Sequence, residues 1–241
     1  MIEFEDSNTP SKLTPDSGQG RLIRVGAGAV ELDGILTIPE NAHGLVILAH
    51  GIEEGLEEDR ALPTHRSGIA LTNIFNGLDL ATFQVDLFNS EERRLNQETG
   101  FFRGNTEIMQ QRLIGMADWF LEHPETQHFS IGYYGMNEAG AGALIAAAER
   151  PDAVAAVVVA GGRVNSARDY LPQVLAPVLF ITAALDETAG KAQQDLLDLL
   201  KGEKSLEQVQ GLDTLAEGSS VVEEVARLAG QWFTRWLVTI G

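Results

Sequence analysis

Residues 129–151 read FSIGYYGMNEAGAGALIAAAERP, and the change of character within this stretch decides the fold. A continuous apolar run at 129–135 ends in a glycine, and a helical segment is expected to follow almost at once at 138–149. The small residues Gly135 and Gly140 allow a strand and a helix to approach each other closely. The stretch therefore predicts a buried strand that turns sharply into a helix.

The same change from apolar run to helix recurs along the chain. Short apolar runs occur at 44–50, 80–88, 129–135, 153–160 and 177–184, with a weaker one at 205–210. Helices are expected at 67–76, 104–122, 138–149 and 188–201, and a last one near Ser220. Buried runs that alternate with amphipathic segments are typical of parallel strands joined by helices. The sequence thus predicts an α/β protein with a mostly parallel central sheet and helices on both faces.

The N-terminal part has a different pattern. In residues 21–40, apolar and polar side chains alternate on both sides of Asp33-Gly34, a dipeptide that favours a two-residue turn. This segment predicts an N-terminal antiparallel hairpin. Residues 1–20 are rich in Pro, Ser, Thr, Asp and Gly without periodicity, so they are expected to form a flexible tail. Residues 21–241 are then expected to form a single domain.

Three polar segments follow predicted strands, at 51–66, 89–104 and 161–176. They are long enough to be functional loops. Open α/β sheets bind ligands beyond the carboxyl ends of their strands. A small-molecule ligand is therefore expected among these loops.

The composition excludes several classes of partner. The chain has 17 Lys and Arg against 35 Asp and Glu, and its net charge of −18 repels nucleic acid and anionic membranes. No apolar run approaches the roughly twenty residues of a membrane span, and the first residues lack the pattern of a secretory signal. Because there is no cysteine, disulfides, a thiolate nucleophile and Cys-bound zinc are excluded. A cytoplasmic location is expected.

The order of these elements resembles the α/β-hydrolase fold, with His50-Gly51 after the first buried strand and a glycine-rich turn after the third. The segments VILAHG, ADWFLEHPETQHFSIGYYG, GALIAAAERPDAVAAVVVAGGR, PVLFITAALDE and VVEEVARLAGQWF are similar to those of dienelactone-hydrolase-like proteins. The resemblance covers residues 21–240. It implies an ester or lactone hydrolase whose serine, aspartate and histidine follow in that order, with the serine on a G-x-S-x-G turn.

Only one of the three catalytic residues implied by this resemblance is present. The serine position falls on Asn137, the acid on Asp186 and the histidine position on Thr214. A carboxamide nitrogen does not attack esters, and a threonine hydroxyl does not accept a proton at neutral pH. The sequence therefore predicts a pseudoenzyme that keeps the hydrolase scaffold without its serine chemistry.

The shape of the turn is nevertheless expected to persist. Its apex demands a positive φ, which asparagine tolerates better than most residues. The resemblance implies that the backbone N–H groups of Ile52 and Glu138 converge as oxyanion donors. A simpler interpretation makes Asn137 a turn residue and helix N-cap, and Asp186 a cap of the helix that begins near Thr188.

Other polar residues near the expected site have open roles. His50 is expected to shape the oxyanion loop, and His65 is a candidate substitute base. Arg163 could pair with Asp186, contact an anionic ligand or hold its loop. The acidic run at 53–59 matches no calcium-loop spacing, so it is expected to be solvated and no metal site is predicted. No G-x-G-x-x-G turn opens a helix, so no cofactor is expected.

Three functions remain open. The first is a ligand-binding protein that retains the pocket. The alternative is a hydrolase with rewired chemistry, in which His65 and Asp186 activate a water near Asn137. The third is an interaction module with a protein partner or a second copy of itself. Neither the ligand nor the oligomeric state can be read from the sequence.

Overall fold

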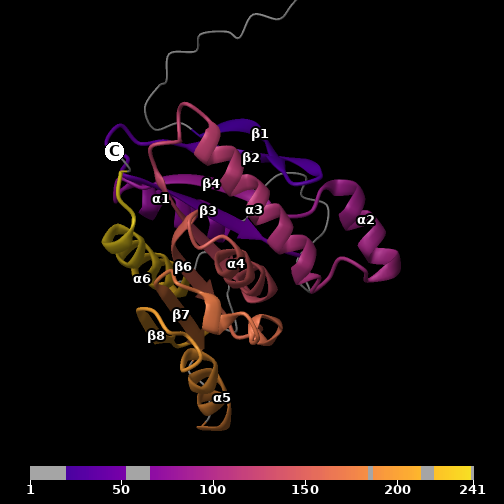
Figure 1. Ribbon diagram of the computed structural model, residues 1–241, viewed down its shortest axis with the longest axis vertical. Helices are drawn as coiled ribbons and strands as arrows, with labels where there is room; N and C mark the ends of the chain where they lie inside the picture. The colour runs from indigo at the N-terminus through magenta and orange to yellow at the C-terminus, as the bar shows by residue number, and fades with distance from the viewer. Residues whose placement is uncertain (1–19, 53–65, 184–186, 213–219, 240–241) are drawn as a thin grey trace, which may run out of the picture.

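A computed structural model describes residues 20–52, 66–183, 187–212 and 220–239 (Figure 1). Eight strands form one sheet in the order β1-β2-β4-β3-β5-β6-β7-β8. Their bounds are β1 Arg21–Ala27, β2 Val30–Thr37, β3 Gly44–His50, β4 Ala81–Asp86, β5 Ser130–Met136, β6 Val154–Ala160, β7 Val178–Ala183 and β8 Lys204–Val209. β1 pairs antiparallel with β2 and β2 antiparallel with β4, whereas every other pair is parallel. The predicted α/β fold with an N-terminal hairpin is confirmed.

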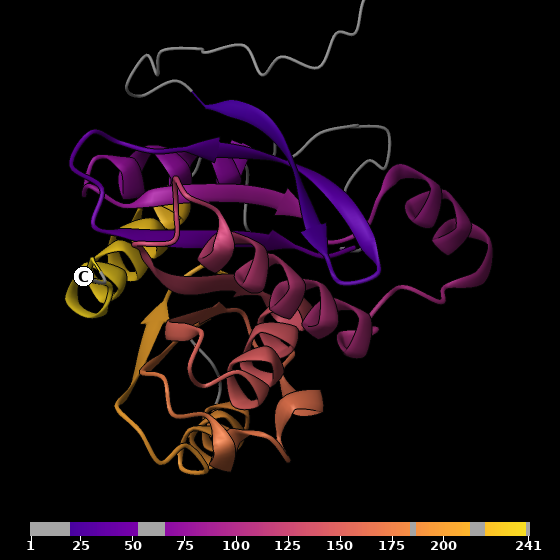
Figure 2. The same cartoon turned by 45° about the horizontal axis from the view of Figure 1, so that its top comes forward.

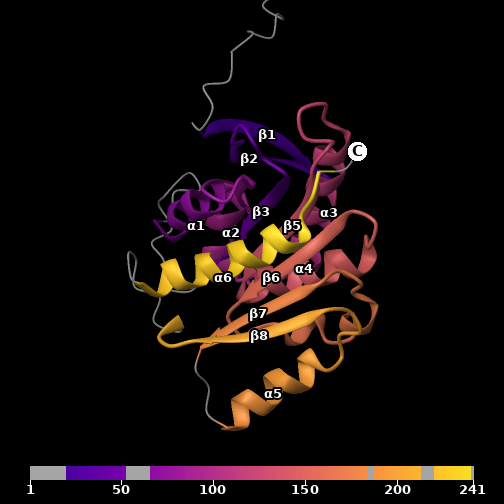
Figure 3. The same cartoon turned by 90° about the vertical axis from the view of Figure 1, so that its left-hand side faces the viewer.

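Helices cover both faces of the sheet. They are α1 Arg66–Asn76, α2 Ser90–Thr99, α3 Thr106–Glu122, α4 Asn137–Glu149, α5 Glu187–Leu197 and α6 Ser220–Trp236, with short 3₁₀ turns η1 Asn165–Ala167 and η2 Leu171–Gln173. Helices α3 and α4 lie on one face (Figure 1), and α1 and α6 on the other (Figure 3). None of the helices in the described ranges is long and apolar enough to cross a membrane.

The two faces explain the continuous apolar runs. In β3, Leu45 and Ile47 belong to the core under α3 and α4, whereas Val46 and Leu48 belong to the core under α1 and α6. Successive side chains of a strand point to opposite faces, so a strand buried on both sides must be apolar throughout. The apolar face expected for the 104–122 helix is also confirmed, since it consists of the buried residues Met109, Leu113, Met116, Ala117 and Phe120.

The hairpin turn lies elsewhere than predicted. The register joins Ala27 to Val30, so the two-residue turn is Gly28-Ala29, and Gly28 has a φ of +69°. Asp33-Gly34 lies inside β2, where Asp33 accepts a hydrogen bond from Arg24 on β1 at 2.7 Å. A Cβ on Gly34 would come within 2.3 Å of the Phe83 ring. Gly34 therefore makes room for the Phe83 ring instead of forming a turn. Figure 2 shows the twisted hairpin above α3.

A second correction concerns the segment 89–104, which was expected to be a loop but contains α2. The helix has almost no apolar face, because Asn96 is its one buried residue among those described. It begins with a capping box in which Asn89 and Glu92 exchange side-chain and backbone hydrogen bonds, both 2.9 Å long. It ends at Gly100 in the left-handed conformation. The sequence of α2 has no apolar periodicity, so its local caps specify the helix.

Buried charges attach α2 to the rest of the protein. Arg112 of α3 donates to Glu92 at 2.8 Å and also to the carbonyl of Leu87, and its guanidinium lies 5.1 Å from the centre of the Phe88 ring. The side chains of Arg112 and Glu92 are only 7% and 16% exposed. Arg93 pairs with Asp86 at the end of β4 at 2.6 Å. Side-chain electrostatics thus hold this connection in place.

The last described residues return to the start of β5. Thr239 forms an isolated antiparallel bridge with Phe129. The Ser130 hydroxyl donates to the carbonyl of Val238 and accepts from its N–H, both at 2.7 Å. The C-terminal segment is therefore fixed at the amino end of β5, opposite the end that carries Met136.

Candidate functional site

Three neighbouring parallel strands, β4, β3 and β5, end together at one edge of the sheet. The register pairs Ala49 with Gly135, and the last residues of β3 and β4, His50 and Asp86, lie side by side. β4 and β5 flank β3 on opposite sides, so the chain changes direction across the sheet at this point. In open α/β sheets, ligands bind beyond the carboxyl ends of the strands at such a switch point.

The β5–α4 turn lies at this switch point. Strand β5 ends at Met136 and α4 begins with Asn137, whose φ is +47°. A Cβ on Gly135 would be 2.6 Å from the Gly140 nitrogen, and a Cβ on Gly140 would be 2.5 Å from Val159. Because no side chain fits at either glycine, the strand and helix touch through their backbones. The positive φ predicted for Asn137 is confirmed.

The N-cap interpretation of Asn137 is wrong. Met136, with φ −100° and ψ 141°, occupies the N-cap position, and no side chain caps the helix there. A residue in the left-handed conformation cannot adopt the extended backbone of an N-cap. Asn137 is instead half-buried and lies against Gly161, where an added Cβ would be 2.3 Å from its Oδ1. Its amide thus points toward the loop that follows β6.

Glu138 and Arg163 form an ion pair beside the turn. The Nε of Arg163 lies 3.3 Å from Oε1 of Glu138, and the two side chains are 55% and 25% exposed. This pair joins the loop after β6 to the first turn of α4. Of the roles left open for Arg163, this pair corresponds to holding its loop, with Glu138 as a partner that the sequence did not indicate. An ion pair this exposed stabilises a protein by about 1 kcal/mol at most.

His50 and Ile52 flank the turn from the β3 side. His50 is half-buried, and its carbonyl accepts a hydrogen bond from Leu87 at 2.8 Å. Ile52 is 8% exposed and belongs to the core under α3 and α4. The N–H of Glu138 lies in the first turn of α4, where helix N–H groups have no partner within the helix. The convergence of the Ile52 and Glu138 N–H groups stays a prediction.

The other predicted site residues lie outside the described residues. These are Asp186, Thr214, His65 and the acidic run at 53–59. In the described ranges, no group of three His, Asp or Glu side chains is placed to hold a metal ion.

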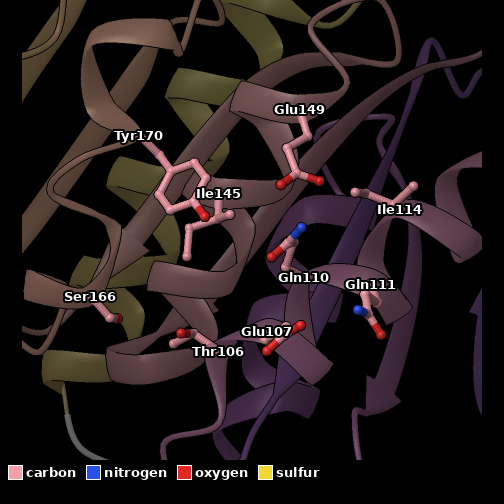
Figure 4. Close-up of a pocket in the computed structure, with 9 residues that line it drawn as sticks. All are labelled: Thr106, Glu107, Gln110, Gln111, Ile114, Ile145, Glu149, Ser166 and Tyr170. Atoms are coloured by element: carbon pink, nitrogen blue, oxygen red, sulfur yellow. The ribbon is translucent and has the colours of Figure 1, made fainter.

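The structure also contains a cavity that the sequence did not indicate. It measures about 570 Å³ and lies between α3, α4 and the segment that contains η1 and η2 (Figure 4). Its lining consists of Thr106, Glu107, Gln110, Gln111, Ile114, Ile145, Glu149, Ser166 and Tyr170. On α3 these residues follow helical spacing, which is the one signal that could have revealed a polar face beside the apolar one. The cavity shares no residue with the Asn137 turn.

Solved structures with this architecture include several hydrolases. A dienelactone hydrolase from Anabaena variabilis ATCC 29413 is 34% identical, with a TM-score of 0.80 over 92% of this chain and 99% of that one. The dienelactone hydrolase-like promiscuous phosphotriesterase P91 from metagenomic libraries is 15% identical (TM-score 0.66, over 92% and 99%). Est1E from Butyrivibrio proteoclasticus is 14% identical (TM-score 0.60, over 89% and 99%). The last two likenesses concern the fold alone.

Curated relatives share the sequence but are longer. Proteins named "Putative phosphoribosyl transferase" from two Mycobacterium tuberculosis strains are 33% identical over 211 residues, which is 88% of this chain and 45% of theirs. The chain thus spans about half the length of these relatives. No family model matches the sequence.

The strand order, the left-handed residue at the β5–α4 turn and the 34% identity over nearly the whole of both chains agree with one another. On this evidence, the chain belongs to the dienelactone-hydrolase-like proteins of the α/β-hydrolase fold.

Proposed function

We propose that this protein is a non-catalytic member of its family, which uses the switch point at Asn137 to bind a small ligand without hydrolysing it. The observation that carries the proposal is the residue at the tip of the turn: an asparagine at φ +47° where acyl transfer requires an activated hydroxyl. The nitrogen lone pair of a carboxamide is delocalised, so Asn137 provides no nucleophile. It does provide two donors and an acceptor for hydrogen bonding.

The surroundings of Asn137 support a particular ligand chemistry. The free N–H groups at the start of α4 favour an acceptor oxygen. Glu138, however, places a carboxylate in the same turn, and its partner Arg163 is thereby neutralised. We therefore infer a ligand that presents a neutral carbonyl or hydroxyl oxygen to Asn137. An anionic ligand would be repelled by the net charge of −18.

Hydrolysis of short-chain aryl esters tests the proposal. We expect the wild-type protein and Asn137→Ala to hydrolyse the ester no faster than a buffer blank. Activity that disappears in Asn137→Ala would contradict the proposal and support the rewired hydrolase. In that case, loss of activity in His65→Ala would identify the substitute base.

Reconstruction separates the scaffold from its chemistry. We expect Asn137→Ser combined with Thr214→His to react with a serine-directed phosphonate, whereas each single variant reacts far less. The reason is that the turn keeps its shape through Gly135 and Gly140, whatever side chain stands at its tip. If the folded double variant gave no label by mass spectrometry, the oxyanion site would not be intact.

The phosphoribosyl transferase name of the relatives is a separate matter. We infer that it does not describe this chain, because a phosphoribosyl donor carries a pyrophosphate that needs a cationic or N–H-rich cradle. The net charge is −18, and Arg163 beside the turn is already paired. Calorimetry with phosphoribosyl pyrophosphate and magnesium should detect no binding. Saturable binding that Arg163→Ala abolishes would contradict this inference.

A further inference from the structure

The cavity between α3 and α4 contains a polar group with no partner. Gln110 is 8% exposed, its side chain lines the cavity, and no group in the described part of the chain forms a hydrogen bond with its amide. Helix α4 packs closely against the backbone of α3 at this point, since a Cβ on Gly142 would come within 2.8 Å of the Met109 Cβ and 3.4 Å of the Gln110 backbone nitrogen. Because the amide faces the cavity, its hydrogen-bond partner must enter the cavity from outside, as solvent or as a ligand.

The charges around Gln110 identify the sign of that partner. Glu107 and Glu149 line the cavity, whereas no Lys, Arg or His among the described residues does. In the described ranges, neither carboxylate forms an ion pair. Figure 4 shows Glu149 and Glu107 toward opposite ends of the cavity with Gln110 between them. The cavity therefore favours a positively charged ligand, and the net charge of −18 adds to that preference.

The spacing of the carboxylates indicates the shape of the ligand. Helices α3 and α4 run side by side in the same direction, since Gly142 meets Met109 and Arg150 pairs with Asp118. Glu149 therefore lies near Ile114, and Ile114 is seven residues from Glu107 along α3. At 1.5 Å per residue this corresponds to about 10 Å. A compact cation could not reach both carboxylates.

We propose that this cavity binds an elongated polyamine. One ammonium group donates to Glu149 and another to Glu107, while an N–H between them donates to the Gln110 carbonyl. The methylene chain lies against Ile114 and Ile145, beside the Tyr170 ring. This site is distinct from the switch point at Asn137 and does not depend on the function proposed there.

Calorimetric titration of the protein with spermidine tests the site. We expect saturable binding to one site, weakened by salt because exposed charges contribute. Glu149→Gln and Gln110→Leu should each weaken binding about tenfold, since each removes a hydrogen bond to a charged ligand. The matched control is Glu40→Gln, which removes the same charge from an exposed turn outside the cavity and should bind like wild type.

A variant without a charge change separates the cavity from the general acidity of the surface. Ser166→Tyr places a bulky side chain at an exposed position of the lining, so it should block binding while leaving the fold intact by circular dichroism. Wild-type affinity in Ser166→Tyr, or equal losses in Glu149→Gln and Glu40→Gln, would show diffuse binding to an acidic surface and overturn the proposal. Absence of any binding at millimolar spermidine would overturn it as well.

Discussion

Two connections at the same edge of the sheet are built in opposite ways. The β5–α4 turn is held by backbone contacts, since Gly135 and Gly140 leave no space for a Cβ. The β4–α2 connection is held by side chains, since the largely buried pair of Glu92 and Arg112 joins α2 to α3. A connection defined by the backbone can lose the chemistry of its tip residue and keep its shape. A connection defined by buried charges loses its structure when one side chain changes.

The largest effect is expected at the charged connection. Arg112→Met should lower the free energy of unfolding by about 3–5 kcal/mol, because it leaves the Glu92 carboxylate buried without its partner. Urea denaturation measures this change. The control is Arg94→Met, which breaks an ion pair whose side chains are 65% exposed and should cost almost nothing. Similar losses in both variants would show that burial does not distinguish the two pairs.

The next largest effect is expected at the backbone turn. Gly135→Ala should cost about 2–3 kcal/mol, because its methyl group would overlap backbone atoms of Ala139 and Gly140. Gly162→Ala is the matched control, since no atom lies within 4 Å of a Cβ at that position. If Gly135→Ala unfolded at the same temperature as wild type, the turn would be able to accommodate a methyl group. The contrast with the charged connection would then disappear.

A smaller effect is expected at the tip of the turn. Asn137→Ala should cost about 1 kcal/mol, because alanine tolerates the left-handed conformation less well than asparagine, whereas Asn137→Gly should be nearly neutral. Differential scanning calorimetry of both variants measures these two stability changes. A large loss in Asn137→Gly would show that the Asn137 side chain itself supports the fold.

The smallest effect is a pH dependence of the charged connection. Burial alone would raise the pKa of Glu92, but hydrogen bonds from Arg112 and the Asn89 N–H, with the Arg112 charge, bring this pKa below its ordinary value of 4.5. A lowered folded-state pKa contributes stability above pH 4.5 that is lost as the pH falls through the folded-state value. The stability difference between wild type and Glu92→Gln should therefore shrink below pH 4.5. A difference that is constant between pH 7 and pH 3 would contradict this linkage.

The sequence predicted the elements that follow strong local rules. The sheet strands could be predicted because they are buried on both faces, and Asn137 because few residues tolerate a positive φ. The turn at Asp33-Gly34 was predicted wrongly, since the pattern cannot show that Phe83 needs the space at Gly34. Helix α2 was missed because its polar sequence has no apolar periodicity.

The missing part of the site prediction has a physical reason as well. The ion pair of Arg163 with Glu138 joins residues from two elements, and the cavity at Gln110 joins residues from α3, α4 and the segment after β6. Neighbours of this kind depend on how helices cross. The crossing is set by small residues such as Gly142, whose contacts no periodicity reveals.

The fixed C-terminal segment has a practical consequence. Strand β5 is seven residues long, about 20 Å. Its first residue, Ser130, binds Val238, and Phe129 just before it bridges Thr239, whereas its last residue precedes Asn137. An affinity tag, a fluorescent dye or a biosensor surface attached through this segment would be anchored at the opposite end of β5 from Asn137. The switch point at Asn137 would then stay accessible to ligands during immobilised measurements.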